Sequence, residues 1–426
     1  MINQDNVYEL MLAERPSRPS LRLYIFFGMT TVALIAFTVL EIIFRDQMFY
    51  DSIKFSVKMQ QQTPNAGTIS NVIGEIITGV GIAYVALCIF IRKQKCGPFR
   101  RFLALALIIW LNVTLRLIYA NTRPSFKSLE LQGSGPFCET DFGNPSGHSI
   151  MVVALHLLVF MDIREHRKNP GVIFDSIGLT CVAILGLSVI FIRLYLGVHA
   201  YSQLILGSLW SVFGVLLIEV LRLEINWYIL EPIFYKEIRF NLRKTVYIIL
   251  LVVIGVFNAL AFLFFGLRLH THGVESEFYN EIVNCLEVKE NYLENFATRI
   301  LASGLIFNFI LFMFLGLNHC PKNVRVGLDF VSEGRIFRIL LRFLVLVLLA
   351  VPIIFAFVPK DGIVAVTIVR SSIIFPADGY IEGRFLVPLL MKFKLVKTRD
   401  LEPHELEPPI EMEELEPPIE MQEIDK

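Results

Sequence analysis

Residues 144–163 read NPSGHSIMVVALHLLVFMDI, a short polar stretch that leads directly into an apolar segment. Pro145 is tolerated in a first helical turn, because its missing N–H would have no partner there. Gly147 lets the backbone approach a ligand closely, and His148 titrates near neutrality. A helix start also presents unpaired N–H groups and a positive dipole end. The stretch therefore predicts an anion site, with an acid/base group beside it, where a helix begins.

Apolar segments recur along the rest of the chain. Its 426 residues are 55% hydrophobic and 18% charged, whereas soluble domains are about 25% charged. Because about 20 apolar residues cross a bilayer, we predict an all-α, polytopic membrane helical bundle of nine to ten spans. The nine lie at 23–44, 69–91, 102–120, 149–163, 172–192, 202–221, 246–269, 300–317 and 339–358. The tenth candidate, 362–391, contains Pro376 and several charged residues.

Charge divides the chain into three regions. Residues 1–22 are a polar N-terminus, 23–395 carry the spans, and 396–426 form an acidic, Pro-rich tail. The formal net charge of zero hides this asymmetry, because 11 acidic residues and one Lys follow residue 399. The tail repeats LEPPIEM at 406–412 and 415–421. Its composition predicts disorder, as either a partner-binding segment or a solvated tail.

Lys and Arg gather in loops on one side of the predicted bundle, which is typical of the cytosolic side. These loops are the N-terminus, 92–95 together with Arg100 and Arg101, 164–168 and 236–244. We therefore expect a cytosolic N-terminus. Segments 121–148, 193–201 and 270–299 then share the lumenal or extracellular side, and the polar residues 45–68 are candidates for an interfacial helix.

Three arginines and two histidines fall near that opposite side, with a serine, a glycine and a glutamine. The set is Arg116, Arg123, Ser146, Gly147, His148, Arg193, His199 and Gln203. Arginines neutralise a phosphoryl group and its developing charge, while one histidine can attack phosphorus and the other can protonate the leaving oxygen. An arginine inside a span is either functional or snorkels to the interface. No carboxylate cluster competes for a metal, so we expect a metal-free mechanism.

The three segments resemble the signature of the type 2 phosphatidic acid phosphatase superfamily. They read Arg116-x6-Arg123-Pro124, Pro145-Ser146-Gly147-His148 and Arg193-x5-His199. Within that superfamily, the run 138–148 and Gln203 are most similar to the glucose-6-phosphatase family. Three features depart from that family: Arg116 replaces Lys, Ile192 replaces Ser, and the span 23–44 is additional, as in lipid phosphate phosphatases.

The resemblance implies hydrolysis of glucose 6-phosphate, or of another phosphomonoester, without a cofactor. His199 would be the nucleophile, His148 the acid, and Gln203 the residue that orients the His199 ring. Arg116, Arg123, Arg193, Ser146 and Gly147 would bind phosphate. The resemblance also implies an endoplasmic reticulum membrane protein with a lumenal site and a separate sugar-phosphate translocase as partner. No nucleic-acid partner is expected.

Two other functions remain open from the sequence. A lipid or polyprenyl phosphate phosphatase is favoured by the additional first span. A non-catalytic transporter or regulator would suit many spans with intramembrane arginines, but it needs no nucleophile and acid. Cys138 and Cys285 are the cysteines expected in lumenal loops, where they could form a disulfide or remain free thiols.

Overall fold

The computed structural model describes residues 18–63, 66–91, 96–119, 121–128, 130–131, 142–167 and 171–230, with a few scattered residues between 248 and 385. This part is helical, as predicted. Its elements are α2 (Leu21–Gln62), α3 (Ala66–Ile91), α4 (Cys96–Tyr119), α5 (Pro124–Lys127), α6 (Gly147–Glu165), α7 (Val172–Tyr195), α8 (Tyr201–Val220), α9 (Arg222–Ile225) and the π-helical turn η1 (Asn226–Leu230). Several predicted features lie outside the described residues: the span 339–358, the tail, Cys138 and Cys285. Only scattered residues of the spans 246–269 and 300–317 and of the tenth candidate are described.

Five described helices are long and apolar enough to cross a membrane. They are α2, residues 96–116 of α4, α6, α7 and α8, while α3 has a shorter apolar stretch, Ile69–Val85. The buried share of the apolar window falls from 72% in α4 to 28% in α7 and 6% in α2. Exposed apolar side chains such as Val32 (67%) and Ile173 (77%) cover α2 and α7. Large exposed apolar surfaces mark contact with lipid, so the chain is a multi-pass membrane protein.

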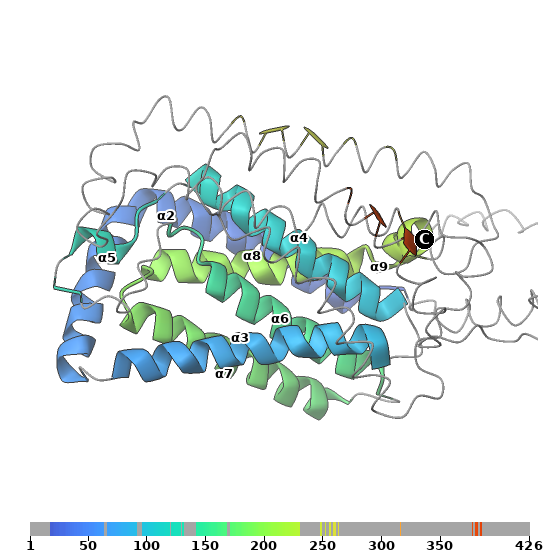
Figure 1. The fold of residues 1–426 in the computed structure, drawn as a ribbon, viewed down its shortest axis with the longest axis horizontal. Helices are drawn as coiled ribbons and strands as arrows, with labels where there is room; N and C mark the ends of the chain where they lie inside the picture. The colour runs from blue at the N-terminus through green and yellow to red at the C-terminus, as the bar shows by residue number, and fades with distance from the viewer. Residues whose placement is uncertain are drawn as a thin grey trace, which may run out of the picture.

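The central helices α4, α6 and α8 share an apolar core. Ile108, Leu155 and Val215, one from each helix, are at most 1% exposed. Helices α3 and α7 pack against α6, and α2 packs along α8 (Figure 1). The motif residues lie at one end of these helices, and a cluster of buried charged side chains lies at the other end.

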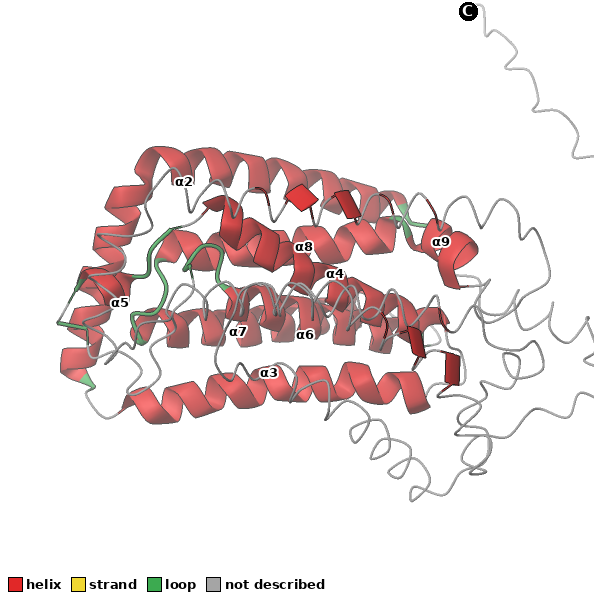
Figure 2. Ribbon diagram, turned by 45° about the horizontal axis from the view of Figure 1, so that its top comes forward, coloured by secondary structure: helices red, strands yellow, loops and turns green. Residues whose placement is uncertain are grey.

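Helix α2 bends at Phe44, whose φ of −110° and ψ of 18° are not helical. Its first half follows α8, and its second half crosses the end of the bundle where α5 lies (Figures 1 and 2). We call residues 45–62 the arm. The polar residues 45–68 were expected to form an interfacial helix; the arm is helical, and it is continuous with the first span.

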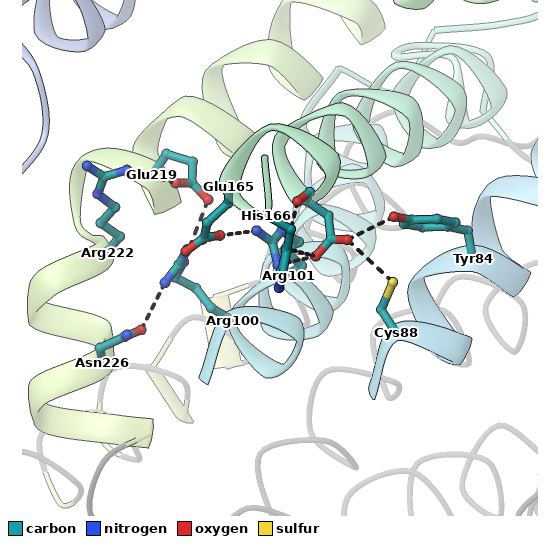
Figure 3. A network of polar contacts seen from close by, with 10 residues as sticks. Tyr84, Cys88, Arg100, Arg101, Glu165, His166, Glu219, Arg222 and Asn226 are labelled. Carbon is teal, nitrogen blue, oxygen red and sulfur yellow. Dashed lines mark hydrogen bonds and ion pairs between the residues drawn. The ribbon is translucent and has the colours of Figure 1, made fainter. Parts of the chain in front are cut away.

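Charged side chains meet inside the bundle at the other end (Figure 3). Arg101 Nη1 lies 2.6 Å from Asp162 Oδ1, and Arg100 Nε lies 3.6 Å from Glu219 Oε1. Both arginines also pair with Glu165. Their side chains are only 1% and 2% exposed. The assignment of Arg100 and Arg101 to a basic loop was therefore wrong, because α4 begins at Cys96 and acidic side chains neutralise both residues within the fold.

Candidate active site

The third motif ends α7 and precedes α8. Arg193 lies in the last turn of α7, and Gly197 N donates to Leu194 O at 2.9 Å. Gly197 has φ of +67°, a left-handed conformation that favours glycine just after a helix end. This turn returns the chain into the bundle, so that His199 is completely buried immediately before α8 begins.

Three contacts determine the proton position on the His199 ring. Nδ1 lies 2.9 Å from Gly143 O and 3.4 Å from Gln203 Oε1. Both oxygens are acceptors, so Nδ1 carries the proton. Nε2 then has the lone pair, and it lies 3.1 Å from Nη1 of Arg123. The nitrogen that can act as a nucleophile therefore faces a guanidinium that is itself only 1% exposed.

The orientation of the Gln203 amide follows from its other partners. Nε2 donates to Thr122 O at 2.8 Å, so Oε1 is the end that accepts from Ala200 N at 3.1 Å and from His199. Residues four apart on one helix share a face, but this contact between Gln203 and His199 arises differently. His199 precedes α8, and Gln203 reaches back from the first turn of the helix as in a capping box.

The second motif begins α6, with Ser146 as the N-cap. Its Oγ accepts from Ser149 N at 3.4 Å, which leaves the hydroxyl proton able to donate to an anion. Ser146 N donates to Gln203 O at 3.0 Å. The backbone amide of Ser146 is therefore already used within the fold, and it is not one of the unpaired N–H groups expected at this helix start.

Arg116 lies over the second motif from the last turn of α4. Its Nε donates to Pro145 O at 3.3 Å. A Cβ at position 147 would displace the Arg116 guanidinium from its present place, so the lack of a side chain at Gly147 permits this close approach. The predicted phosphate-binding residues Arg116 and Gly147 are thus direct neighbours.

A carboxylate that the sequence analysis did not assign joins His148 to Arg193. Glu75 Oε1 on α3 lies 3.2 Å from His148 Nε2 and 2.7 Å from Arg193 Nη2. The Arg193 side chain is 2% exposed, whereas Glu75 is 57% exposed. A single acid within an apolar stretch was the available signal, because such residues are costly in a membrane and are often functional.

A second unassigned carboxylate, Glu41 on the first half of α2, holds two motif-bearing segments. Glu41 Oε1 accepts from Asn121 Nδ2 at 3.1 Å and from Asn144 Nδ2 at 3.2 Å. Arg45 pairs with it at 2.9 Å. Asn121 precedes Arg123 by two residues and Asn144 precedes the second motif, so this fully buried acid ties the two segments together.

The arm holds the third motif by hydrogen bonds to its backbone. Ser56 Oγ donates to Leu194 O at 2.6 Å, and Gln60 Nε2 donates to Tyr195 O at 2.8 Å. The backbone N–H of Tyr201 donates to Ser52 Oγ at 2.9 Å. The end of α7 and the start of α8, on either side of His199, are thus fixed by one polar face of α2.

Replacing Glu41 with alanine is expected to lower kcat/KM for phosphate release about 10- to 100-fold. The change leaves the buried Asn144 amide and the half-buried Asn121 amide without this acceptor, at about 1–3 kcal/mol for the buried donor. Each 1.4 kcal/mol lost from the transition state costs tenfold in rate. Steady-state assays of the purified variant measure this loss. Asp46→Ala, an exposed acid of the same helix, is the control, and equal activity of the two variants would remove Glu41 from the site.

The eight predicted site residues thus lie at one end of the bundle, linked through Pro145, Glu75 and the contacts above. Within the described ranges, no three His, Cys, Asp or Glu side chains are grouped as metal ligands. A multi-pass helical bundle with arginines and two histidines gathered at one end has the features of a membrane phosphatase.

Comparison with protein families supports that class. The model of the PAP2 superfamily, whose members are phosphatases, matches residues 99–227, so this segment is a PAP2 superfamily domain. It extends from the first turn of α4 into η1. Comparisons with curated proteins and with solved structures found no match. Helices α2 and α3, which carry Glu41 and Glu75, precede the matched segment.

Proposed function

We propose that this protein hydrolyses phosphate monoesters through a phosphohistidine on His199, and that glucose 6-phosphate is its substrate. The observation that carries the proposal is the set of contacts made by the two ring nitrogens of His199. Nδ1 donates to Gly143 O and Gln203 Oε1, which leaves the Nε2 lone pair beside the Arg123 guanidinium. A phosphoryl group bound by Arg123 would present its phosphorus to that lone pair.

In the first step, His199 Nε2 attacks phosphorus and the bond between phosphorus and the ester oxygen breaks. The leaving oxygen takes a proton from His148. Arg116, Arg123 and Arg193, with the Ser146 hydroxyl, stabilise the charge on the equatorial oxygens, and such preorganised donors act most strongly where water is excluded. Arg123 and Arg193 are at most 2% exposed.

In the second step, His148 takes a proton from water, and the resulting hydroxide attacks the phosphohistidine. The phosphorus–nitrogen bond breaks, inorganic phosphate leaves, and His199 regains its lone pair. His148 is again protonated, so the cycle closes without any further reactant. This use of one group as acid and then as base follows from microscopic reversibility.

Two observations bear on the substrate. Gln203 at the position behind His199, together with the run 138–148, favours glucose 6-phosphate by resemblance. Helix α2, an additional helix before the matched domain, favours a lipid phosphate, because lipid phosphate phosphatases also have three spans before the second motif. For the sugar phosphate we further propose a lumenal site in the endoplasmic reticulum membrane, supplied by a separate translocase.

Phosphate release by detergent-purified protein tests these alternatives. We expect kcat/KM for glucose 6-phosphate to exceed that for lysophosphatidic acid by about tenfold or more, the scale on which a site distinguishes substrates by several contacts. The reverse order would replace the sugar with a lipid phosphate. Transport of glucose 6-phosphate into proteoliposomes without phosphate release, unchanged in His199→Ala, would replace the enzyme with a carrier.

A further inference from the structure

Glu75 lies outside the PAP2-matched segment, yet it touches two of the predicted site residues. Its Oε1 contacts His148 Nε2 at 3.2 Å and Arg193 Nη2 at 2.7 Å. The residue comes from α3, while His148 begins α6 and Arg193 ends α7. One carboxylate oxygen therefore joins three helices at the site, and Glu75 is the one charged residue of the stretch Ile69–Val85.

The contact decides which nitrogen of His148 bears a proton. Glu75 is ion-paired with Arg193, and an ionised carboxylate only accepts hydrogen bonds. His148 Nε2 must therefore carry hydrogen. This is the opposite of His199, whose Nε2 accepts from Arg123 and whose Nδ1 carries the proton. The two histidines are thus in complementary states. Nε2 of His148 carries hydrogen that can be donated, whereas Nε2 of His199 carries the lone pair that can attack phosphorus.

We propose that Glu75 is a positioning residue that acts through the acid, because it keeps a proton on Nε2 of His148. The inference rests on the proposed phosphatase function. His148 enters the first step as the imidazolium, with hydrogen on both ring nitrogens, and the leaving oxygen of the substrate replaces Glu75 Oε1 as the acceptor of the Nε2 proton, which leaves a neutral imidazole. The bond between phosphorus and that oxygen breaks as the proton moves to it, and water returns the proton to His148 in the second step.

The leaving group supplies a test that a merely structural role would not satisfy. A poor alkyl leaving group needs the acid, whereas an aryl leaving group departs with little protonation. Glu75→Gln keeps the shape of the side chain, but its amide can either donate or accept, so both His148 tautomers are allowed. We expect kcat/KM for glucose 6-phosphate to fall about tenfold more than kcat/KM for p-nitrophenyl phosphate. Glu75→Asp should recover part of the difference, because it restores an acceptor-only group.

A double variant shows whether Glu75 acts through His148. In a His148→Ala background, Glu75→Gln is expected to cause no further loss on glucose 6-phosphate, since residues that act as a unit are not additive. Glu224→Gln, an exposed acid on α9, is the matched control. Equal losses on both substrates, or losses that add to that of His148→Ala, would overturn the inference while leaving the phosphatase intact. If the unmodified protein hydrolyses neither substrate, the proposed function itself fails.

Discussion

Replacing His199 with alanine is expected to lower phosphate release from every phosphomonoester by about 10⁴-fold or more, the scale of losses when a nucleophile is removed. His199 is completely buried, and its Nε2, whose lone pair would attack phosphorus, lies 3.1 Å from Arg123. Steady-state assays measure the loss. Rapid quenching with labelled substrate should recover an acid-labile phosphoenzyme from the unmodified protein and none from the variant.

The control for this experiment is His156→Ala. His156 lies on α6, eight residues after His148, and is not one of the site residues. Its Nδ1 lies 2.8 Å from Val152 O, within its own helix. It tests whether the loss of a partly buried histidine by itself reduces activity. We expect it to keep activity within a factor of about three. Substantial activity in His199→Ala, or a phosphoenzyme that survives the change, would place the nucleophile elsewhere.

Replacing Asp162 with alanine is expected to destabilise the protein by about 3–5 kcal/mol, because removing one partner of a buried ion pair leaves the other charge uncompensated. Asp162 is 1% exposed; its carboxylate lies 2.6 Å from Arg101 and accepts from the Tyr84 hydroxyl at 2.8 Å. Figure 3 shows Arg101 and Tyr84 within the same polar network. Thermal unfolding in detergent should show a fall in Tm on the order of 10 °C.

Activity distinguishes this structural effect from a catalytic one. Asp162 lies 14 residues after His148 on α6, about 20 Å along the helix, so kcat well below Tm should remain close to that of the unmodified protein. Asp175→Ala is the matched control, because Asp175 pairs with Arg164 at 2.8 Å on the surface, where both side chains are at least 31% exposed. Such pairs contribute about 0–1 kcal/mol. Equal Tm values for the two variants would mean that the buried network does not stabilise the fold.

Most of the described helices could be predicted from apolar runs alone. The apolar runs at 69–91, 172–192 and 202–221 correspond to helices α3, α7 and α8 within a few residues. Of these three, α7 and α8 are long and apolar enough to cross a membrane, whereas the apolar stretch of α3 is shorter. The predicted helix bounds were wrong where a charged residue was taken to mark the end of a helix. Arg45 begins a further stretch of α2, since it pairs with Glu41 one turn earlier, and Arg100 and Arg101 lie inside α4, since acids on α6 and α8 neutralise them.

The predicted site residues come together because each lies in or beside the first or last turn of a helix, or in a connection at the same end of the bundle. The positions of the motifs relative to the apolar runs predict that placement. Glu75 and Glu41 could not be assigned in this way. A lone acid in an apolar run indicates a cost, but its partners lie far along the chain: Arg193 is 118 residues after Glu75, and Asn144 is 103 residues after Glu41. Only the packing of α2 and α3 against the domain reveals these pairs.

The arm also sets an order for assembly. Ser56 and Gln60 leave the ribosome early, but their acceptors Leu194 and Tyr195 follow 138 and 135 residues later. Contacts of such long sequence separation form late, because a long loop must close before they can be made. Helix α2 precedes the other described helices along the chain, yet the contacts of its arm can form only after α7 and the start of α8 have been synthesised.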